Sequence, residues 1–267
     1  MLVLRVMGFF YFDESIHPKG KFSLGVFIYS ESSLECSVRD ALLESGLVPK
    51  VDEYKSGARM DTNPEQKRAR ELLKSVIYKQ CGIGVVVAPD DPRQVLGLEA
   101  LRGLKKILST VTFSSKSHDV FFDEGIFESE AKASRHAAQT LSGCPPCTFH
   151  FEQDSIKVLG LQVADLVAHT CAMMLLAELG LLNKIVKAGE NSGYDPDLGI
   201  ELEFELWAGM RGSFFAAPPP PVDTWKSQAD FCVEVASRGL HVADYCDTGV
   251  RTAALARFGS MYLGCIH

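Results

Sequence analysis

Short apolar runs alternate with longer amphipathic segments over the first two thirds of the chain. Runs of this length that are rich in aromatic and β-branched residues predict strands. The first two runs are joined by a short polar connection with Pro18 and Gly20, which predicts an antiparallel hairpin. The third run, GIGVVVAP, is typical of a strand covered on both faces. The predicted strands span residues 8–14, 22–29, 82–89, 119–124 and 148–152.

The longer segments between these runs repeat their apolar residues with the spacing of helices. Asn63 and Pro64 predict the start of one helix, because asparagine caps helices and proline is tolerated in the first turn. Strands that alternate with helices indicate a mixed or parallel sheet flanked by helices, so we expect an α/β fold. The predicted helices span residues 64–80, 92–110, 128–142 and 158–182.

The pattern becomes less regular after residue 183. Glycine, proline and acidic residues dominate residues 189–225, which include the run PPPP. The alternating segment IELEFELW (200–207) predicts an amphipathic strand, and one or two helices are predicted within residues 222–267. We expect a domain over residues 1–182 and a C-terminal extension over residues 183–267, joined by the Pro-rich linker and packed on the core.

Composition limits the classes of function. A chain of 267 residues with 46% hydrophobic residues can build a large core without disulfides. A net charge of −7 argues against a broad basic surface for nucleic acid, although a local basic patch is compatible with it. Arg5 interrupts the apolar N-terminus, and residues 158–182 carry too many polar groups for a membrane span. We expect a soluble cytoplasmic protein without membrane contact, whose cysteines stay reduced.

Two of the aromatic runs end in adjacent acids, YFDE at residues 11–14 and FFDE at residues 121–124. Side chains alternate across a strand, so one acid of each pair, such as Asp13 and Asp123, can point into a common site. Acids at the ends of neighbouring strands converge on the edge of an α/β sheet where ligands usually bind. Acids that end strands also commonly cap turns, and this alternative stays open.

The long predicted helix is apolar except for one polar stripe, Gln162, Asp165 and His169. If this helix lies on the sheet, Asp165 can meet Asp13 and Asp123. Three carboxylates repel one another unless a divalent cation or a shared proton neutralises them. Carboxylates are preferred ligands of Mg²⁺ and Mn²⁺, and pairs of such ions hydrolyse phosphodiesters. The alternative is a structural Asp165 that caps a backbone or pairs with an arginine.

Three short motifs occur in an order that resembles a known family. They are YFDES at residues 11–15, VFFDEG at residues 120–125 and DSIKVLGLQVADLVAH at residues 154–169. Their order and spacing resemble DUF3800, a family of bacterial and phage proteins in the ribonuclease H-like superfamily. The resemblance covers roughly residues 8–182, with Glu53-Tyr54-Lys55 as the family's Glu-x-Lys element.

The resemblance implies a ribonuclease H-like mixed sheet flanked by helices, with a site built from acids. The implied catalytic and metal-binding acids are Asp13, Asp123 and Asp165. The candidates for a further catalytic acid are Glu14, Glu53 and Glu124.

Three polar residues are candidates for binding substrate. Lys55 would contact a phosphate, and the alternative is a surface lysine paired with Glu53. His169 could contact a phosphate or carry a proton, or it could be a hydrogen-bonded core histidine. Gln162, on the same stripe, is the third candidate.

Two features depart from the family pattern. Ile16 follows Ser15 where the family's first motif continues with glycine, so the turn after the first strand is expected to differ. No third strand of the expected meander is evident within residues 30–60.

These observations together predict a Mg²⁺- or Mn²⁺-dependent phosphodiesterase, a nuclease whose partner is DNA or RNA. The resemblance implies a setting in defence or mobile-element biology. The alternative is a non-catalytic binding or assembly module, in which the acids are structural and the C-terminal extension binds a partner protein or a second copy of the chain.

The segment Cys144-Pro-Pro-Cys147, with His150 nearby, admits a thiol or zinc site, but the two prolines favour a turn. The remaining histidines in polar contexts are expected to be solvated. They are His17, His118, His136 and His241.

Overall fold

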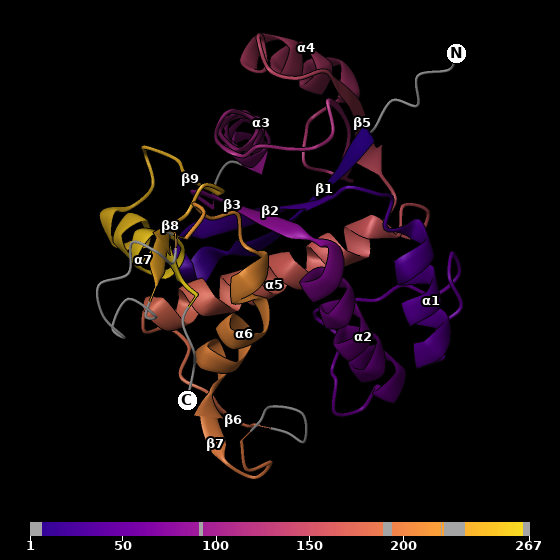
Figure 1. Cartoon of the computed structure of the whole chain (residues 1–267), viewed down its shortest axis with the longest axis vertical. Coiled ribbons are helices and arrows are strands. Elements are labelled where there is room, and N and C mark those ends of the chain that lie inside the picture. Colours follow the sequence, from indigo (N-terminus) through magenta and orange to yellow (C-terminus); the bar gives the residue numbers. More distant parts are fainter. Residues whose placement is uncertain (1–6, 91–92, 189–193, 220, 222–232, 264–267) are drawn as a thin grey trace.

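A six-stranded mixed sheet forms the centre of the computed structural model, which describes residues 7–90, 93–188, 194–219, 221 and 233–263 (Figure 1). The strand order is β5-β4-β1-β2-β3-β9. The strands are β1 Met7–His17, β2 Phe22–Ser30, β3 Gly82–Ala88, β4 Ser117–Asp123, β5 Cys147–Gln153 and β9 Leu240–Val242. All of the predicted strands up to residue 152 are therefore confirmed.

The directions of the strands define the topology. β1, β2 and β3 form an antiparallel meander, and β4 and β5 then add in parallel on the free side of β1. A meander followed by two parallel strands on the side of the first is the ribonuclease H-like arrangement, so the predicted fold class is confirmed. The third strand of the meander is β3, which lies after two helices. For this reason residues 31–60 contain no strand.

Helices cover both faces of the sheet (Figure 1). α3 and α4 lie on one face, and α5 crosses the other, where α1, α2, α6 and α7 surround it. The helices are α1 Glu35–Ser45, α2 Pro64–Gln80, α3 Arg93–Thr110, α4 Glu130–Thr140, α5 Gly160–Glu178, α6 Leu202–Met210 and α7 Thr248–Phe258. The four predicted helices are thus confirmed with small shifts at their ends, whereas α1 was not predicted.

The aromatic runs supply the core beneath α3. Phe12 of β1 packs on Phe27 of β2 and on Phe122 of β4, with ring centroids 4.7 and 5.3 Å apart. All three rings are fully buried. Large aromatic side chains bury more area than any others, so these strands gain much of their stability from this layer. The side chains that alternate with these along β1 and β4, such as Tyr11, face α5.

α5 is the central helix of the opposite layer. Among the described residues it is the one helix long and apolar enough to cross a membrane by length and composition, and 72% of that apolar window is buried inside the fold. It packs against β1 and β2. Burial on this scale is what a core helix requires, and it explains why the helix is apolar on almost every side.

The prediction of a strand over IELEFELW was wrong. β7 spans Gly199–Glu201, where it pairs with β6 (Ile185–Lys187), and the rest of the segment is helix α6. Leu206 and Met210 are buried, one turn apart, and α6 packs on α5. The apolar residues of this segment fit both the alternation of a strand and the 3.6-residue period of a helix, and packing on α5 favours the helix.

The C-terminal residues contribute to the central sheet. β9 adds in parallel to β3 at the edge of the meander. α7, at 248–258, is the helix foreseen within residues 222–267, whereas three short strands there were not foreseen, because three residues carry too little pattern. These strands are β9, β8 (Glu234–Ala236) and β10 (Ser260–Tyr262).

A candidate acidic site

β1 and β4 bring the two aromatic runs side by side. The strands are parallel, and Phe12 pairs with Phe122. Asp13 and Asp123 are the next residues of each run, so they occupy equivalent positions on neighbouring strands. The ends of the two runs therefore meet, as expected from the sequence.

Both acids lie on the face that α5 covers. Tyr11 and Phe121 come two residues earlier on each strand, and their rings stack at 5.4 Å. Gly160 at the start of α5 sits on the Tyr11 ring, which any added Cβ would strike. This close approach seats the first turn of α5 on β1 and brings Asp165 toward the two strand acids.

Asp13 is buried among other acids. The residue is 8% exposed, and its Oδ1 accepts a hydrogen bond from the backbone N–H of Glu14 at 2.7 Å. Burial raises the pKa of Asp13, and the charges of Asp123, Glu14 and Asp165 raise it further, to about 9. The other two predicted core acids are thus close enough to Asp13 to repel its charge.

Asp123 shares this environment. Burial raises its pKa to about 7, and the charge of Glu14 adds to the rise, whereas the ammonium of Lys55 opposes it. Glu124 is exposed. Of the candidates for a further acid, the carboxylates of Glu14 and Glu53 therefore act on Asp123, whereas Glu124 acts on it only through a hydrogen bond from its backbone N–H, which lowers the pKa.

Asp165 is held by the loop before α2. Its Oδ2 accepts a hydrogen bond from the backbone N–H of Ser56 at 2.8 Å, and its Oδ1 accepts one from the Ser56 hydroxyl at 2.6 Å. The structural alternative for Asp165, a bond to a neighbouring backbone, is therefore present. Because each carboxylate oxygen has a second lone pair, these bonds leave capacity for a cation. Ser56 was not predicted, since a loop serine gives no distinctive sequence signal.

Glu53 and Lys55 lie beside these acids. The Lys55 ammonium is 2.6 Å from a carboxylate oxygen of Glu53, which also accepts a hydrogen bond from the Ser155 hydroxyl. Burial tends to lower the pKa of Lys55, but Glu53 outweighs it and the net shift is upward. The Lys55 side chain is 61% exposed, so it pairs with Glu53, as the alternative foresaw, and is also open to a phosphate.

The expectation that Gln162 binds substrate is corrected by its contacts. Gln162 is fully buried. Its Oε1 accepts a hydrogen bond from the backbone N–H of Tyr54, and its amide nitrogen donates one to the carbonyl of Ser155, both at 2.9 Å. The side chain thus ties two loops to α5. Both ends of the amide are occupied, so Gln162 positions the Glu53–Lys55 segment.

Two of the histidines that were expected to be solvated, His118 and His241, are not. His118 is buried among aromatic rings, and His241 bonds to Glu99 at 2.6 Å. Burial lowers the pKa of His17, and the charge of His169 lowers it further. Burial also lowers the pKa of His169, although the charge of Asp165 opposes this. His169 is half-buried and lines a cavity next to the acids.

The described geometry of the cysteine segment favours neither a reactive thiolate nor a zinc site. Burial raises the pKa of Cys147 to about 12, which disfavours the reactive thiolate. The ring of His150 stacks on Phe121 at 4.4 Å, and its Nε2 lies 3.4 Å from an oxygen of Asp119. Among the described residues, no three histidine, cysteine or acidic side chains stand close enough to hold a metal ion as they lie. The zinc alternative therefore has no support.

The acids Asp13, Asp123 and Asp165 are the candidate ligands for Mg²⁺ or Mn²⁺, but among the described residues their side chains also do not stand close enough to hold an ion as they lie. The donor chemistry fits these ions, because Asp13, Asp123 and Asp165 offer oxygen ligands, and their mutual repulsion favours a cation. Their side chains are not gathered into one coordination sphere. Binding would therefore require changes in side-chain rotamers.

No protein-family model matches the chain, and no curated protein matches it. Among solved structures, it is similar to the ribonuclease H2 from Pyrococcus horikoshii OT3. The sequence identity is 13%, the TM-score is 0.37, and the overlap covers 61% of this chain and 71% of that chain. The order and directions of the strands, rather than this likeness, define the fold.

Proposed function

We propose that this chain is a divalent-metal-dependent phosphodiesterase that acts on nucleic acid. The observation that carries the proposal is the approach of Asp13, Asp123 and Asp165 on one face of a ribonuclease H-like sheet. Buried acids that repel one another are costly unless protons or a cation neutralise them. Mg²⁺ or Mn²⁺ suits this donor set. The resemblance to DUF3800 remains a hypothesis that rests on the order of the motifs.

The surrounding residues have defined roles in this proposal. A bound Mg²⁺ or Mn²⁺ would activate water and stabilise the leaving oxygen. Asp13, Asp123 and Asp165 would hold the ion, and Ser56 would keep Asp165 oriented through its two hydrogen bonds. Lys55 would contact the phosphate from the exposed side.

The test is a calorimetric titration of Mn²⁺ into the wild type, Asp13→Asn and Asp165→Asn. The matched control is Asp119→Asn, which makes the same change at the other end of β4. We expect saturable binding in the wild type and the control, and its loss in both site variants. The wild type and the control should also cleave single-stranded or duplex DNA or RNA in the presence of the metal ion, and the two site variants should not.

Two outcomes would contradict the proposal. One is Mn²⁺ binding that both site variants retain, which would place the ion elsewhere. The other is a wild type that binds no Mn²⁺ either alone or with a phosphorothioate oligonucleotide, which can complete the coordination but resists cleavage. Thermal melting of each variant shows whether a loss of binding is merely a loss of folding.

A further inference from the structure

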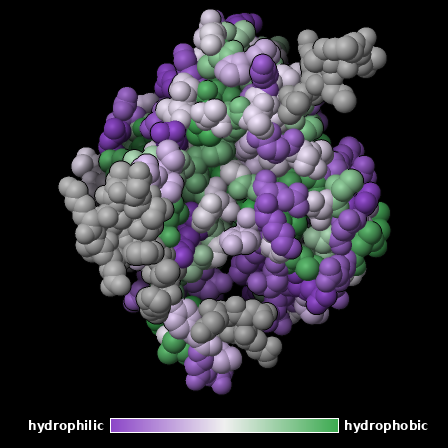
Figure 2. Space-filling view, in the orientation of Figure 1, coloured by the Kyte–Doolittle hydropathy of each residue, from purple (hydrophilic) through white to green (hydrophobic). Residues whose placement is uncertain are grey.

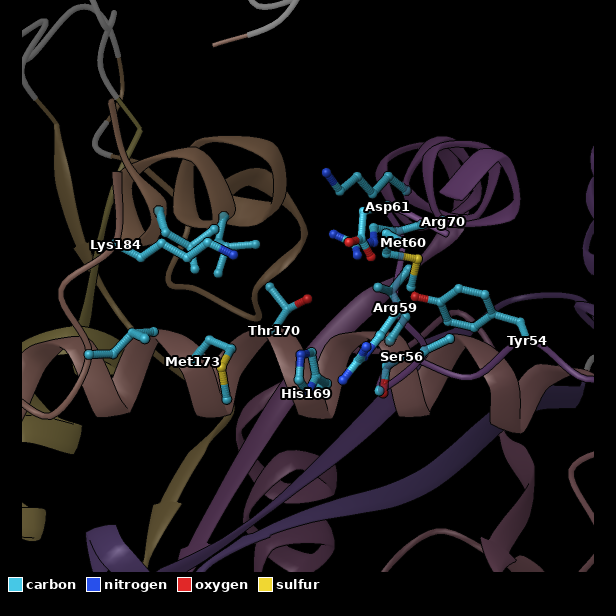
Figure 3. Close-up of a pocket in the computed structure, with 17 residues that line it drawn as sticks. Tyr54, Ser56, Arg59, Met60, Asp61, Arg70, His169, Thr170, Met173 and Lys184 are labelled. Carbon is cyan, nitrogen blue, oxygen red and sulfur yellow. The ribbon is translucent and has the colours of Figure 1, made fainter. Parts of the chain in front are cut away.

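A cavity of about 630 Å³ lies on α5 between α2 and α6, on the side of α5 that faces away from the sheet (Figure 3). In the space-filling view, the surface is hollowed between these two helices and its rim is largely hydrophilic (Figure 2). Small-molecule pockets have volumes of roughly 300–1,000 Å³, so the cavity can hold a ligand of that class.

Three cations of this cavity have no acidic partner among the described residues. Arg59, Arg70 and Lys184 line it, with Lys184 across from the two arginines (Figure 3). Within the described ranges none of them forms an ion pair, whereas Lys74 at the same cavity is 3.0 Å from Glu205. The one carboxylate among the described lining residues is that of Asp61. In a chain with a net charge of −7, this local excess of positive charge favours an anionic ligand.

Tyr54 provides an independent sign of a ligand. Its side chain is fully buried and lines the cavity, and its hydroxyl has no hydrogen-bond partner in the part of the chain that the structure describes. Burial raises the pKa of this hydroxyl, and the charge of Arg70 opposes the rise, but the two groups do not meet in hydrogen-bond geometry. A buried hydroxyl without a partner costs free energy, which a polar ligand atom would recover.

The rest of the cavity is apolar. The side chains of α5 and α6 form this part, opposite the arginines, and Met173 is seen there on α5 (Figure 3). An apolar surface beside cations suits a flat heterocycle that carries a phosphate. The apolar lining residues of the two helices are Leu166, Met173, Leu202 and Leu206.

The cavity is connected to the acidic site through one residue. Ser56 lines the cavity and donates both of its hydrogen bonds to Asp165. His169, one helical turn beyond Asp165, also lines it. A ligand phosphate beside Ser56 would therefore lie next to the site of the proposed reaction.

We propose that this cavity binds one nucleotide unit, with its phosphate between Arg59 and Arg70 and its base against Met173 and the leucines of α6. Tyr54 donates its hydroxyl to this unit. The assignment of the nucleotide to a substrate strand, whose adjoining phosphodiester reaches the acids, rests on the proposed function. The binding of a nucleotide does not, because it depends on the cations and the cavity alone.

The experiment measures binding without cleavage, in EDTA. A fluorescein-labelled single-stranded oligonucleotide, as DNA and as RNA, is titrated by fluorescence anisotropy, and adenosine 5′-monophosphate is added as a competitor. Arg59→Gln and Arg70→Gln should each weaken binding about tenfold, since each loses a charge-assisted contact. Tyr54→Phe, which removes one oxygen, should weaken it about threefold.

The control is Arg135→Gln, the same change on the exposed surface of α4, which should stay within about twofold of the wild type. Competition by the monophosphate, lost in the arginine variants, would show that a free nucleotide suffices. If the arginine variants weaken oligonucleotide binding but the monophosphate does not compete with it, the nucleotide binds only as part of a strand. Variants that bind both probes like the wild type, or a wild type that binds neither, would overturn the proposal.

The two proposals fail separately. If Mn²⁺ supports cleavage that Asp13→Asn abolishes while the arginine variants bind and cleave normally, the cavity proposal is wrong and the proposed function stands. If the arginine variants lose binding while the wild type cleaves no nucleic acid with any divalent cation, the cavity proposal stands and the proposed function is wrong.

Discussion

The charged carboxylate of Asp13 is required for metal binding in the proposed function, but the same charge destabilises the fold because it is buried. A carboxyl whose residue is 8% exposed and surrounded by three other acids is unfavourable as a charge. The folded chain without metal therefore keeps a proton on Asp13 at neutral pH, and a cation must displace that proton to bind. Metal affinity should accordingly increase with pH.

The same shift predicts how stability depends on pH in EDTA. The pKa of Asp13 is about 9 in the folded chain and near 3.8 in the unfolded chain, so between these values the folded state binds more protons. Stability should therefore fall as pH rises through this window, by at most about 1.4 kcal/mol per pH unit from this group. Urea unfolding of the wild type and Asp13→Asn at several pH values measures it. Equal slopes for the two proteins would contradict the burial of this charge.

At the scale of elements, the position of α5 decides whether Asp165 reaches the strand acids. α5 can lie on β1 because Gly160 has no Cβ to strike Tyr11. Gly209 of α6, in contrast, has open space around it. These two helical glycines allow a matched test of packing against helix propensity.

Gly160→Ala should destabilise the fold by about 1–3 kcal/mol, because the new methyl group forces α5 away from β1. Gly209→Ala should leave stability unchanged or raise it by up to about 1 kcal/mol, which is the ordinary effect of alanine in a helix. Chemical unfolding measures both, and a Mn²⁺ titration of Gly160→Ala should show weaker binding as Asp165 shifts. Stabilisation by both substitutions would mean that α5 is not seated on Tyr11.

The sequence pattern correctly predicted those helices and strands whose apolar residues lie on one buried face. The meeting of Asp13 and Asp123 followed from alternation on two strands that are neighbours in the sheet. The strand predicted at 200–207 was wrong because the apolar residues of this segment also fit the spacing of a helix, and packing on α5 favours that helix. Gln162 was predicted to bind substrate because a sequence shows polarity but not the partners that satisfy it.

At the scale of the whole molecule, one buried acid adds side-chain bonds to the strand pairing and helix packing that hold the C-terminal residues on the core. Glu99 of α3 is 1% exposed, bonds to His241 of β9 and Tyr245, and pairs with Arg102. More than 100 residues separate Glu99 from its C-terminal partners, so no local pattern foretold this contact or the cavity assembled from α2, α5 and α6. Burial tends to raise the pKa of Glu99, but its hydrogen bonds from His241 and Tyr245 outweigh this and lower it.

Glu99 and Asp13 should therefore limit the stability of the molecule from opposite sides of the pH scale. The folded pKa of Glu99 lies below its unfolded value near 4.5, so its contribution is present above that pH and is lost as pH falls through the folded pKa. Glu99→Gln should cost about 1–3 kcal/mol at pH 7, because it removes the charge from three hydrogen bonds, and should flatten the acid limb of the profile. Asp13→Asn should flatten the other limb. Unfolding curves of the wild type, both single variants and the double variant from acid to alkaline pH test this assignment. If Glu99→Gln instead changed the alkaline limb, β9 would not be held to α3 by this charge.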